Sequence, residues 1–370
     1  MFLKLCKPGK YGQWILAFAV GVCSFTAGQA FTWPAPALPM IRHGTAGFTM
    51  TPDEESWMVT CLFIANIITP IPAGYIMDFI GRKRTLMIFV LLSICSWLVI
   101  YFTHCALGMY IARALVGAWS GFVYTVVPVL IGEVFSAEVR GSMGAVFGIM
   151  LYLGGLYEII FGMFVSYDVL TLISLIPPII LFITLLILPE VPVYYLMKGK
   201  KEDAANSMEW LKGECDRTQL DSMEESVKEQ LKTRGTFLDI FRVRPYRKAF
   251  IIAEALTAFR SMAGLSLLLS YATVTVPKSF LDSEQSFLLL DIVWILGSIT
   301  SFFIMDKFGR RTLLIFSSIG STVTMIAVAI WYYLRDMTTV DTESTNWFPL
   351  IGLMVNGAFY TMGLVTIPIL

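Results

Sequence analysis

One string occurs twice in the chain: DFIGRKRTL at residues 78–86 and DKFGRRTL at residues 306–313. Both copies read Asp-x-x-Gly-Arg followed by further basic residues, and both follow a long apolar run. In such a turn the Asp ends one helix, the Gly permits a tight reversal, and the basic side chains hold the next helix at a membrane surface. The repeat at matching positions predicts two related halves, an arrangement known among multi-span membrane proteins.

The composition places the chain in a membrane. Of its 370 residues, 56% are hydrophobic and 15% are charged, whereas a soluble domain averages about 45–50% apolar and about 25% charged residues. The charges gather in a few segments, and the apolar runs between them are long enough to cross about 30 Å of hydrocarbon as a helix. We therefore expect an all-α integral membrane protein and exclude a soluble domain.

Ten apolar runs are candidate transmembrane helices. They cover residues 13–33, 56–77, 86–103, 108–131, 142–165, 169–188, 249–272, 286–305, 312–334 and 347–370. The predicted domains are an N-terminal six-helix half (1–188), a cytosolic linker (189–248) and an incomplete C-terminal half of four helices (249–370). Because the first half has six candidate helices, we expect twelve in a complete repeat and interpret the chain as lacking the last two.

The basic residues are distributed asymmetrically. With the N-terminus in the cytosol, the inward-facing segments hold 22 of the 27 Lys and Arg residues, and the other five are Arg42, Arg113, Arg260, Lys278 and Arg335. This asymmetry is what the positive-inside rule describes, so it predicts a cytosolic N-terminus. The polar linker carries apolar residues such as Met208, Leu211 and Leu220 at near-helical spacing, which predicts short amphipathic helices at the cytosolic surface.

Further motifs give the chain a family resemblance. One is Arg113-x-x-x-Gly117-x-x-x-Gly121, continued by Pro128 and Glu133 and ending in Arg140-Gly141; another is the string PEVPVYYL at 189–196. With the repeated turns, they resemble the major facilitator superfamily and its sugar porter branch. The stretch from 204 to 213 is similar to insect facilitated trehalose transporters and hexose facilitators. The resemblance implies a helical bundle of two pseudo-symmetric halves in the plasma membrane.

The resemblance also implies a charge network at the cytosolic turns. In the family, such residues link the two halves when the cavity faces outward and separate when it faces inward. The residues of this chain at the matching positions are Asp78, Gly81, Arg82, Glu133, Arg140, Asp306, Gly309, Arg310 and Arg311.

The positions that contact sugar in the family depart from its pattern. Gly148 stands where the family has Gln, the family's Gln-Gln-Leu-Ser-Gly-Ile-Asn string is replaced by RSMAGLS at 260–266, and the aromatic ring after Pro368 is lost. The candidate substrate-binding residues are Gly148, Tyr152, Arg260, Ser261, Ser266 and Asn356.

Arg260 and Arg113 are charges placed within apolar runs. A charged residue inside a transmembrane helix suggests a functional role, and for Arg260 the alternatives are an anionic solute, a structural pair or an acidic partner such as Glu158. Arg113 lies near the predicted outer start of its helix, where it either anchors the helix in solvent or packs against neighbouring helices.

These observations favour a facilitative uniporter of a sugar, either a hexose or trehalose, that works by alternating access. We expect no enzyme activity, cofactor, metal or nucleic acid partner; the partners are a small polar solute and the bilayer, and the oligomeric state stays open. Because the first span carries no carboxylate like that of the family's proton-coupled members, uniport is favoured over symport. Two alternatives remain: a non-transporting or truncated inactive relative, and an organic-ion carrier of the same superfamily.

Overall fold

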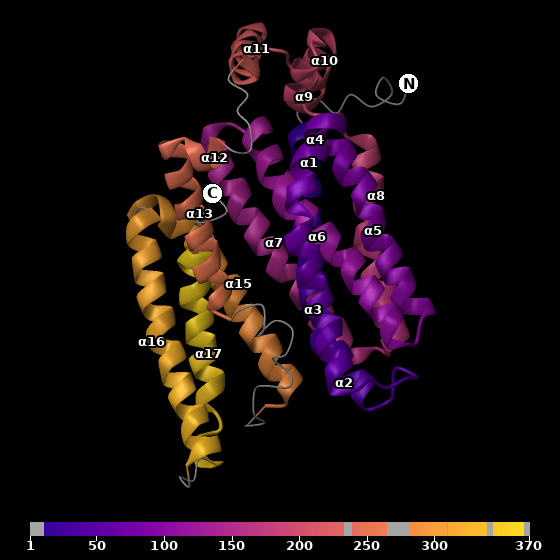
Figure 1. Cartoon of the computed structure of the whole chain (residues 1–370), viewed down its shortest axis with the longest axis vertical. Helices are drawn as coiled ribbons and strands as arrows, with labels where there is room; N and C mark the ends of the chain where they lie inside the picture. Colours follow the sequence, from indigo (N-terminus) through magenta and orange to yellow (C-terminus); the bar gives the residue numbers. More distant parts are fainter. Residues whose placement is uncertain (1–10, 233–238, 265–280, 309, 339–342, 366–370) are drawn as a thin grey trace.

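The computed structural model describes residues 11–232, 239–264, 281–308, 310–338 and 343–365, and every regular element in these ranges is a helix. The helices run lengthwise through an elongated bundle, in which an N-terminal and a C-terminal group stand side by side (Figure 1).

The N-terminal group is built from eight helices: α1 (Gly12–Thr32), α2 (Pro34–Arg42), α3 (Pro52–Ile68), α4 (Pro70–Ile80), α5 (Arg82–Phe102), α6 (Ala106–Val134), α7 (Ala137–Phe164) and α8 (Tyr167–Ile187). α1 packs on α6, α7 and α8, while α5 packs on α6 and α8. Glycines make the α1–α7 contact close, because a Cβ at Gly28 would strike the backbone of Leu151 and one at Gly154 the backbone of Phe25. Small residues at such crossings allow helices in membranes to approach closely.

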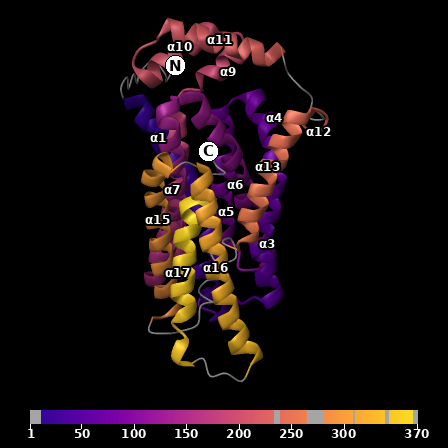
Figure 2. The ribbon, with the colours of Figure 1, turned by 90° about the vertical axis from the view of Figure 1, so that its left-hand side faces the viewer.

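Four short helices follow: α9 (Pro192–Met197), α10 (Lys201–Lys212), α11 (Arg217–Lys232) and α12 (Asp239–Arg242). The apolar residues singled out from the sequence, Met208, Leu211 and Leu220, are buried. The predicted amphipathic helices are therefore present, and α9–α11 lie across one end of the bundle (Figure 2). We call this end the linker end and the opposite one, where α2 lies, the α2 end.

The C-terminal group consists of α13 (Arg244–Met262), α15 (Ser283–Phe308), α16 (Arg310–Met337), the 3₁₀ turn η3 (Glu343–Thr345), α17 (Phe348–Phe359) and the π-helical turn η4 (Tyr360–Val365). α17 packs on α15 and α16. The main contact between the two groups is that of α7 with α15.

The helices follow the order of the predicted spans, but not all of them are long and apolar enough to cross a membrane. In the described ranges, six helices are long and apolar enough to cross a membrane, or seven if α3 and α4, bent by 49° at Thr69, count as one. Shorter apolar helices lie at Gln285–Ser301 and Phe348–Leu364. α13 covers residues 249–262 of the predicted span 249–272. The count of ten therefore stays a prediction.

Candidate functional site

The first copy of the repeated turn forms a compact charge cluster at the linker end. Gly81 has φ of 107°, a conformation that suits glycine, and it joins α4 to α5. The buried Arg82 side chain lies 3.0 Å from Asp78 and 2.8 Å from Glu133 on α6, and it also donates to the Met77 carbonyl. Asp78, Gly81, Arg82 and Glu133 are thus brought together as the sequence predicted.

Glu190 also belongs to this cluster, although it is not among the residues that the family resemblance places in the network. Its carboxylate accepts hydrogen bonds from the backbone N–H groups of Lys83 and Arg84 at 2.8 and 3.1 Å, which are first-turn donors of α5. An anionic group at a helix N-terminus satisfies free donors and complements the helix dipole. The Pro-Glu string at 189–190 is the sequence feature that could have indicated this role. Through Glu190, the segment before α9 binds the turn between α4 and α5.

Of the other predicted members of the network, Arg140 and Arg311 have described side chains. Arg140 is exposed, and its guanidinium donates a hydrogen bond to the Phe135 carbonyl at 3.4 Å. Arg311 is also exposed. Gly309 lies outside the described residues, as do the side chains of Asp306 and Arg310, so pairing across the two copies stays a prediction.

A second polar cluster lies where α7 meets α15. The Tyr152 ring on α7 and the Trp294 ring on α15 lie edge to face with centroids 6.1 Å apart, and both are buried. The Tyr152 hydroxyl and the Trp294 indole N–H have no hydrogen-bond partner among the described residues. Unused donors of this kind can pair with a ligand that the helices enclose.

Two further candidate residues border this cluster. A Cβ at Gly148 would meet no atom within 4 Å, so α7 faces open space one turn before Tyr152. The half-buried Arg260 lies in the last turn of α13, and its carbonyl accepts a hydrogen bond of 2.8 Å from the Tyr360 hydroxyl. The Arg260 guanidinium also acts electrostatically on Tyr124, Tyr152 and Tyr360. Gly148, Tyr152 and Arg260 therefore share one central region, with Tyr124, Tyr360 and Trp294 as members that had no signal in the sequence.

Two of the candidate substrate-binding residues lie outside the central region, and a third is not described by the structure. Ser261 is exposed, and its hydroxyl donates to the Thr257 carbonyl within α13. Asn356 is buried and accepts hydrogen bonds from Ser321 and Thr324 of α16, so it joins α16 to α17. Ser266 lies outside the described residues.

Glu158 lies within the N-terminal group and does not hydrogen-bond Arg260. It is buried and accepts hydrogen bonds from Gln29 of α1 at 2.8 Å and from Ser174 of α8 at 2.9 Å. The charge that acts on it is Arg113. Pairing of Glu158 with Arg260, one of the options left by the sequence, is therefore not supported.

Arg113 packs between helices and is not a solvated anchor. It is fully buried, donates to the Ala30 carbonyl at 2.7 Å and lies over the Trp33 ring at 5.7 Å. The cationic side chain thereby joins α6 to the end of α1.

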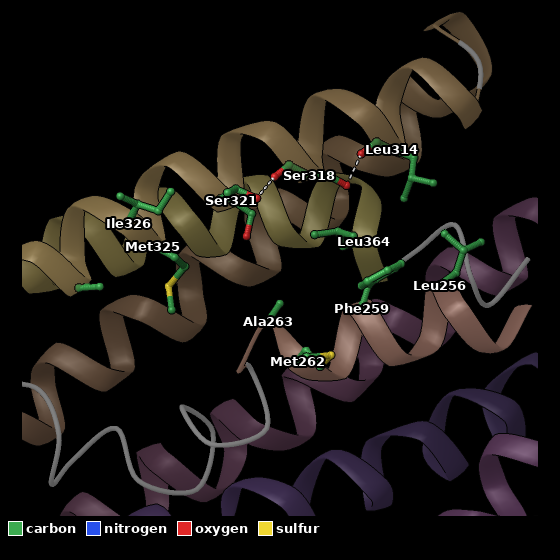
Figure 3. A pocket seen from close by; sticks show the side chains of 12 residues that line it. Leu256, Phe259, Met262, Ala263, Leu314, Ser318, Ser321, Met325, Ile326 and Leu364 are labelled. Atoms are coloured by element: carbon green, nitrogen blue, oxygen red, sulfur yellow. Dashed lines mark hydrogen bonds between the residues drawn. The ribbon is translucent and has the colours of Figure 1, made fainter. Parts of the chain in front are cut away.

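A groove of about 650 Å³ opens between α13 and α16 (Figure 3). Phe259, Met262, Met325 and other mostly apolar side chains line it. The hydroxyl of Ser318 already donates to the Leu314 carbonyl. The groove offers apolar surface and few free polar groups, so it is poorly suited to a polyhydroxyl solute.

The bundle of apolar helices, the basic turns at one end and the polar cluster between two helix groups define a class of protein, the multi-span membrane carrier. The family model described as sugar (and other) transporter matches residues 43–370, and the chain belongs to this family. Its function is accordingly that of a sugar transporter.

Relatives and solved structures agree with this assignment. The chain is 28% identical to the facilitated trehalose transporter Tret1 of Apis mellifera ligustica, over 98% of this chain and 73% of the relative. It is 26% identical to sugar transporter ERD6-like 6 of Arabidopsis thaliana, over 96% of this chain and 73% of the relative. The xylose transporter XylE of E. coli, in a partially occluded inward-open conformation, superposes with a TM-score of 0.78 at 16% identity, over 95% of this chain and 82% of XylE. The fold is thus that of the major facilitator superfamily.

Proposed function

We propose that the chain carries a hexose or trehalose down its concentration gradient by alternating access. In this mechanism residues 1–188 and 249–370 act as two halves that rock about the α7–α15 contact. The solute lies between them, and no bond in it is made or broken, so the cycle has no catalytic step.

The observation that carries this proposal is the position of the central region. Tyr152 and Trp294 come from different helix groups, and their polar atoms are unpaired within the described part of the chain. A sugar gives up many hydrogen bonds on leaving water, and each unpaired hydroxyl costs about 1–3 kcal/mol. Hydroxyl, indole and guanidinium groups from both sides can replace those bonds, and the aromatic faces give the ring carbons an apolar surface.

The solute class follows from the relatives. The Tret1 proteins are named for trehalose transport, and the alignments with two of them cover 98% and 97% of this chain. Arg260 supplies one observation in favour of an organic anion instead, because its charge reaches the central tyrosines.

The location of the chain is part of the proposal. We infer that it lies in the plasma membrane with its N-terminus and linker end in the cytosol, because this orientation puts the basic turns inside. Labelling of an epitope tag at the N-terminus of intact cells tests it: we expect labelling only after permeabilisation.

Uptake in a transport-deficient host tests the function. Cells expressing the chain should take up labelled trehalose or glucose faster than control cells, without accumulation above the outside concentration. In the Arg260→Gln variant, sugar uptake should persist. If the unmodified chain carries a labelled organic anion and no sugar, and the Arg260→Gln variant does not carry the anion, the chain is an organic-ion carrier and not a sugar carrier. Absence of any uptake, with the protein at the surface, would count against both.

A further inference from the structure

Asp291 is a buried carboxyl group that has no partner in the part of the chain that the structure describes. It lies on α15 with 0% of its surface exposed, and neither carboxyl oxygen has a hydrogen-bond partner among the described residues. It faces Gly155 of α7, where an added Cβ would lie 3.6 Å from one carboxyl oxygen and 2.7 Å from the Thr32 hydroxyl oxygen. The carboxyl group is therefore enclosed by the contact between the two helix groups.

Among the described residues, the groups that face Asp291 give it no counter-charge. From α7, the Tyr152 hydroxyl interacts with it electrostatically, and Glu158, one turn beyond Gly155, is bound to Gln29 and Ser174. η4 contributes Tyr360, which is bound to the Arg260 carbonyl. α17 carries no titratable side chain. On α16, Arg335 pairs with Asp336 and lies over the Tyr332 ring, while Tyr333 and Arg311 are exposed.

A lone carboxylate is not stable in such a place. Burial of an ionised carboxyl without a partner is so costly that the group takes up a proton instead. Each oxygen also lacks the donors that hold Glu158 in its site. The enclosed form of Asp291 is thus the neutral one, and the charged form requires contact with water.

Asp291 lies toward the α2 end of the α7–α15 contact. It follows the first residue of α15 by about two turns, or about 12 Å of helix, and the end of α7 packs near α2, since a Cβ at Gly162 would strike Pro36. Water can reach the carboxyl group when the two helices separate at this end.

We propose that Asp291 is a proton-binding site, whose protonation is required for α7 and α15 to close at the α2 end. Acid in the solution at this end favours the closed state, and deprotonation favours opening. The proton is taken from and returned to the same side, so that movement of the sugar stays downhill. The inference rests on the proposed rocking of the two halves.

The distance between the helix ends tests the site without any sugar. Spin labels are placed at Phe164→Cys on α7 and Gln285→Cys on α15, two exposed positions, after the six native cysteines are replaced. In purified, reconstituted protein the closed, short-distance population should grow as the pH is lowered from 8 to 5, by up to about tenfold in the closed-to-open ratio per pH unit for one proton. A distance distribution that does not change with pH would overturn the proposal.

Two variants assign the effect to this residue. Asp291→Asn cannot lose a proton, so it should give the short distance at every pH. Asp282→Asn removes an exposed carboxyl group just before α15 and should keep the pH response of the parent. If Asp291→Asn also keeps that response, another group is responsible and the proposal is wrong; if this variant does not fold, Asp291→Glu serves, with the pH response shifted but present.

Sugar uptake is scored separately. A parent protein that changes distance with pH and carries no sugar would leave the proton site standing and remove the transport function. A parent protein that carries sugar but shows no pH-dependent change of distance would support the transport function and overturn the proton site.

Discussion

Glu158 shows at the residue scale how a buried carboxyl group holds a membrane bundle together. Its oxygens receive hydrogen bonds from Gln29 and Ser174, and Arg113 acts on it through space. One side chain on α7 thus connects α1, α6 and α8.

Replacement of Glu158 by Ala should destabilise the protein by about 3 kcal/mol, because it leaves the buried Gln29 amide without its acceptor and opens a cavity between α1, α7 and α8. Glu158→Gln keeps one oxygen acceptor and should cost less. Thermal unfolding in detergent measures both. An Ala variant as stable as the parent would show that this cluster adds nothing to the fold.

At the scale of elements, the packing of α1 on α7 depends on glycine. Gly154→Leu should disrupt the contact, because even a Cβ at this position meets the backbone of Phe25, and overpacking costs about 1–3 kcal/mol or more. Gly132→Leu on α6 is the matched control, since a Cβ there meets no atom within 4 Å. Surface expression and melting temperature should fall for the first variant alone; equal losses in both would mean that the close crossing is not what matters.

The linker helices respond to acid through Glu224. Hydrogen bonds from Lys201 and Lys228 hold the pKa of Glu224 at about 2, below its ordinary value of 4.5. A lowered pKa means that the ion pairs contribute fully above about pH 4.5 and that this contribution is lost as the pH falls toward 2. The effect is small, because the pairs are exposed to solvent.

Hydrogen exchange measures this response as protection factors of α11. They should be constant from pH 8 to 5 and decline below 4.5, and Glu224→Gln should lower them at neutral pH. Glu225→Gln, a change at a neighbouring exposed residue, should not. Protection of α11 that is the same in parent and Glu224→Gln would contradict the assignment.

At the scale of the whole molecule, the charge cluster at the linker end should bias the rocking of the halves. The Arg82→Gln variant replaces the guanidinium by a neutral amide and leaves Glu133 and Asp78 without their cation. A bias of about 1.4 kcal/mol is a tenfold change in an equilibrium, so we expect sugar uptake to fall about tenfold at unchanged surface level. The exchanged pair Arg82→Glu with Glu133→Arg should recover part of the rate; no recovery would mean that charge pairing is not the cause.

The sequence predicted the architecture better than the site. Apolar runs, charge asymmetry and a repeated turn are local or periodic signals, so the helices and the Asp78–Arg82–Glu133 cluster could be anticipated. The central region could not, because Trp294 and Asp291 of α15 and Tyr360 of η4 stand in apolar runs where nothing in the sequence links them to each other. Their importance lies in what surrounds them in three dimensions, as the unsupported pairing of Glu158 with Arg260 also shows.

Counterflow in proteoliposomes tests the central claim most directly. Vesicles containing the purified chain are loaded with unlabelled trehalose or glucose and diluted into a trace of the labelled sugar. A carrier that exposes one site to each side in turn predicts transient accumulation of label inside, and this overshoot should be reduced in Tyr152→Ala. Entry of label that only approaches the outside concentration, or no entry beyond that of empty vesicles, would contradict the account.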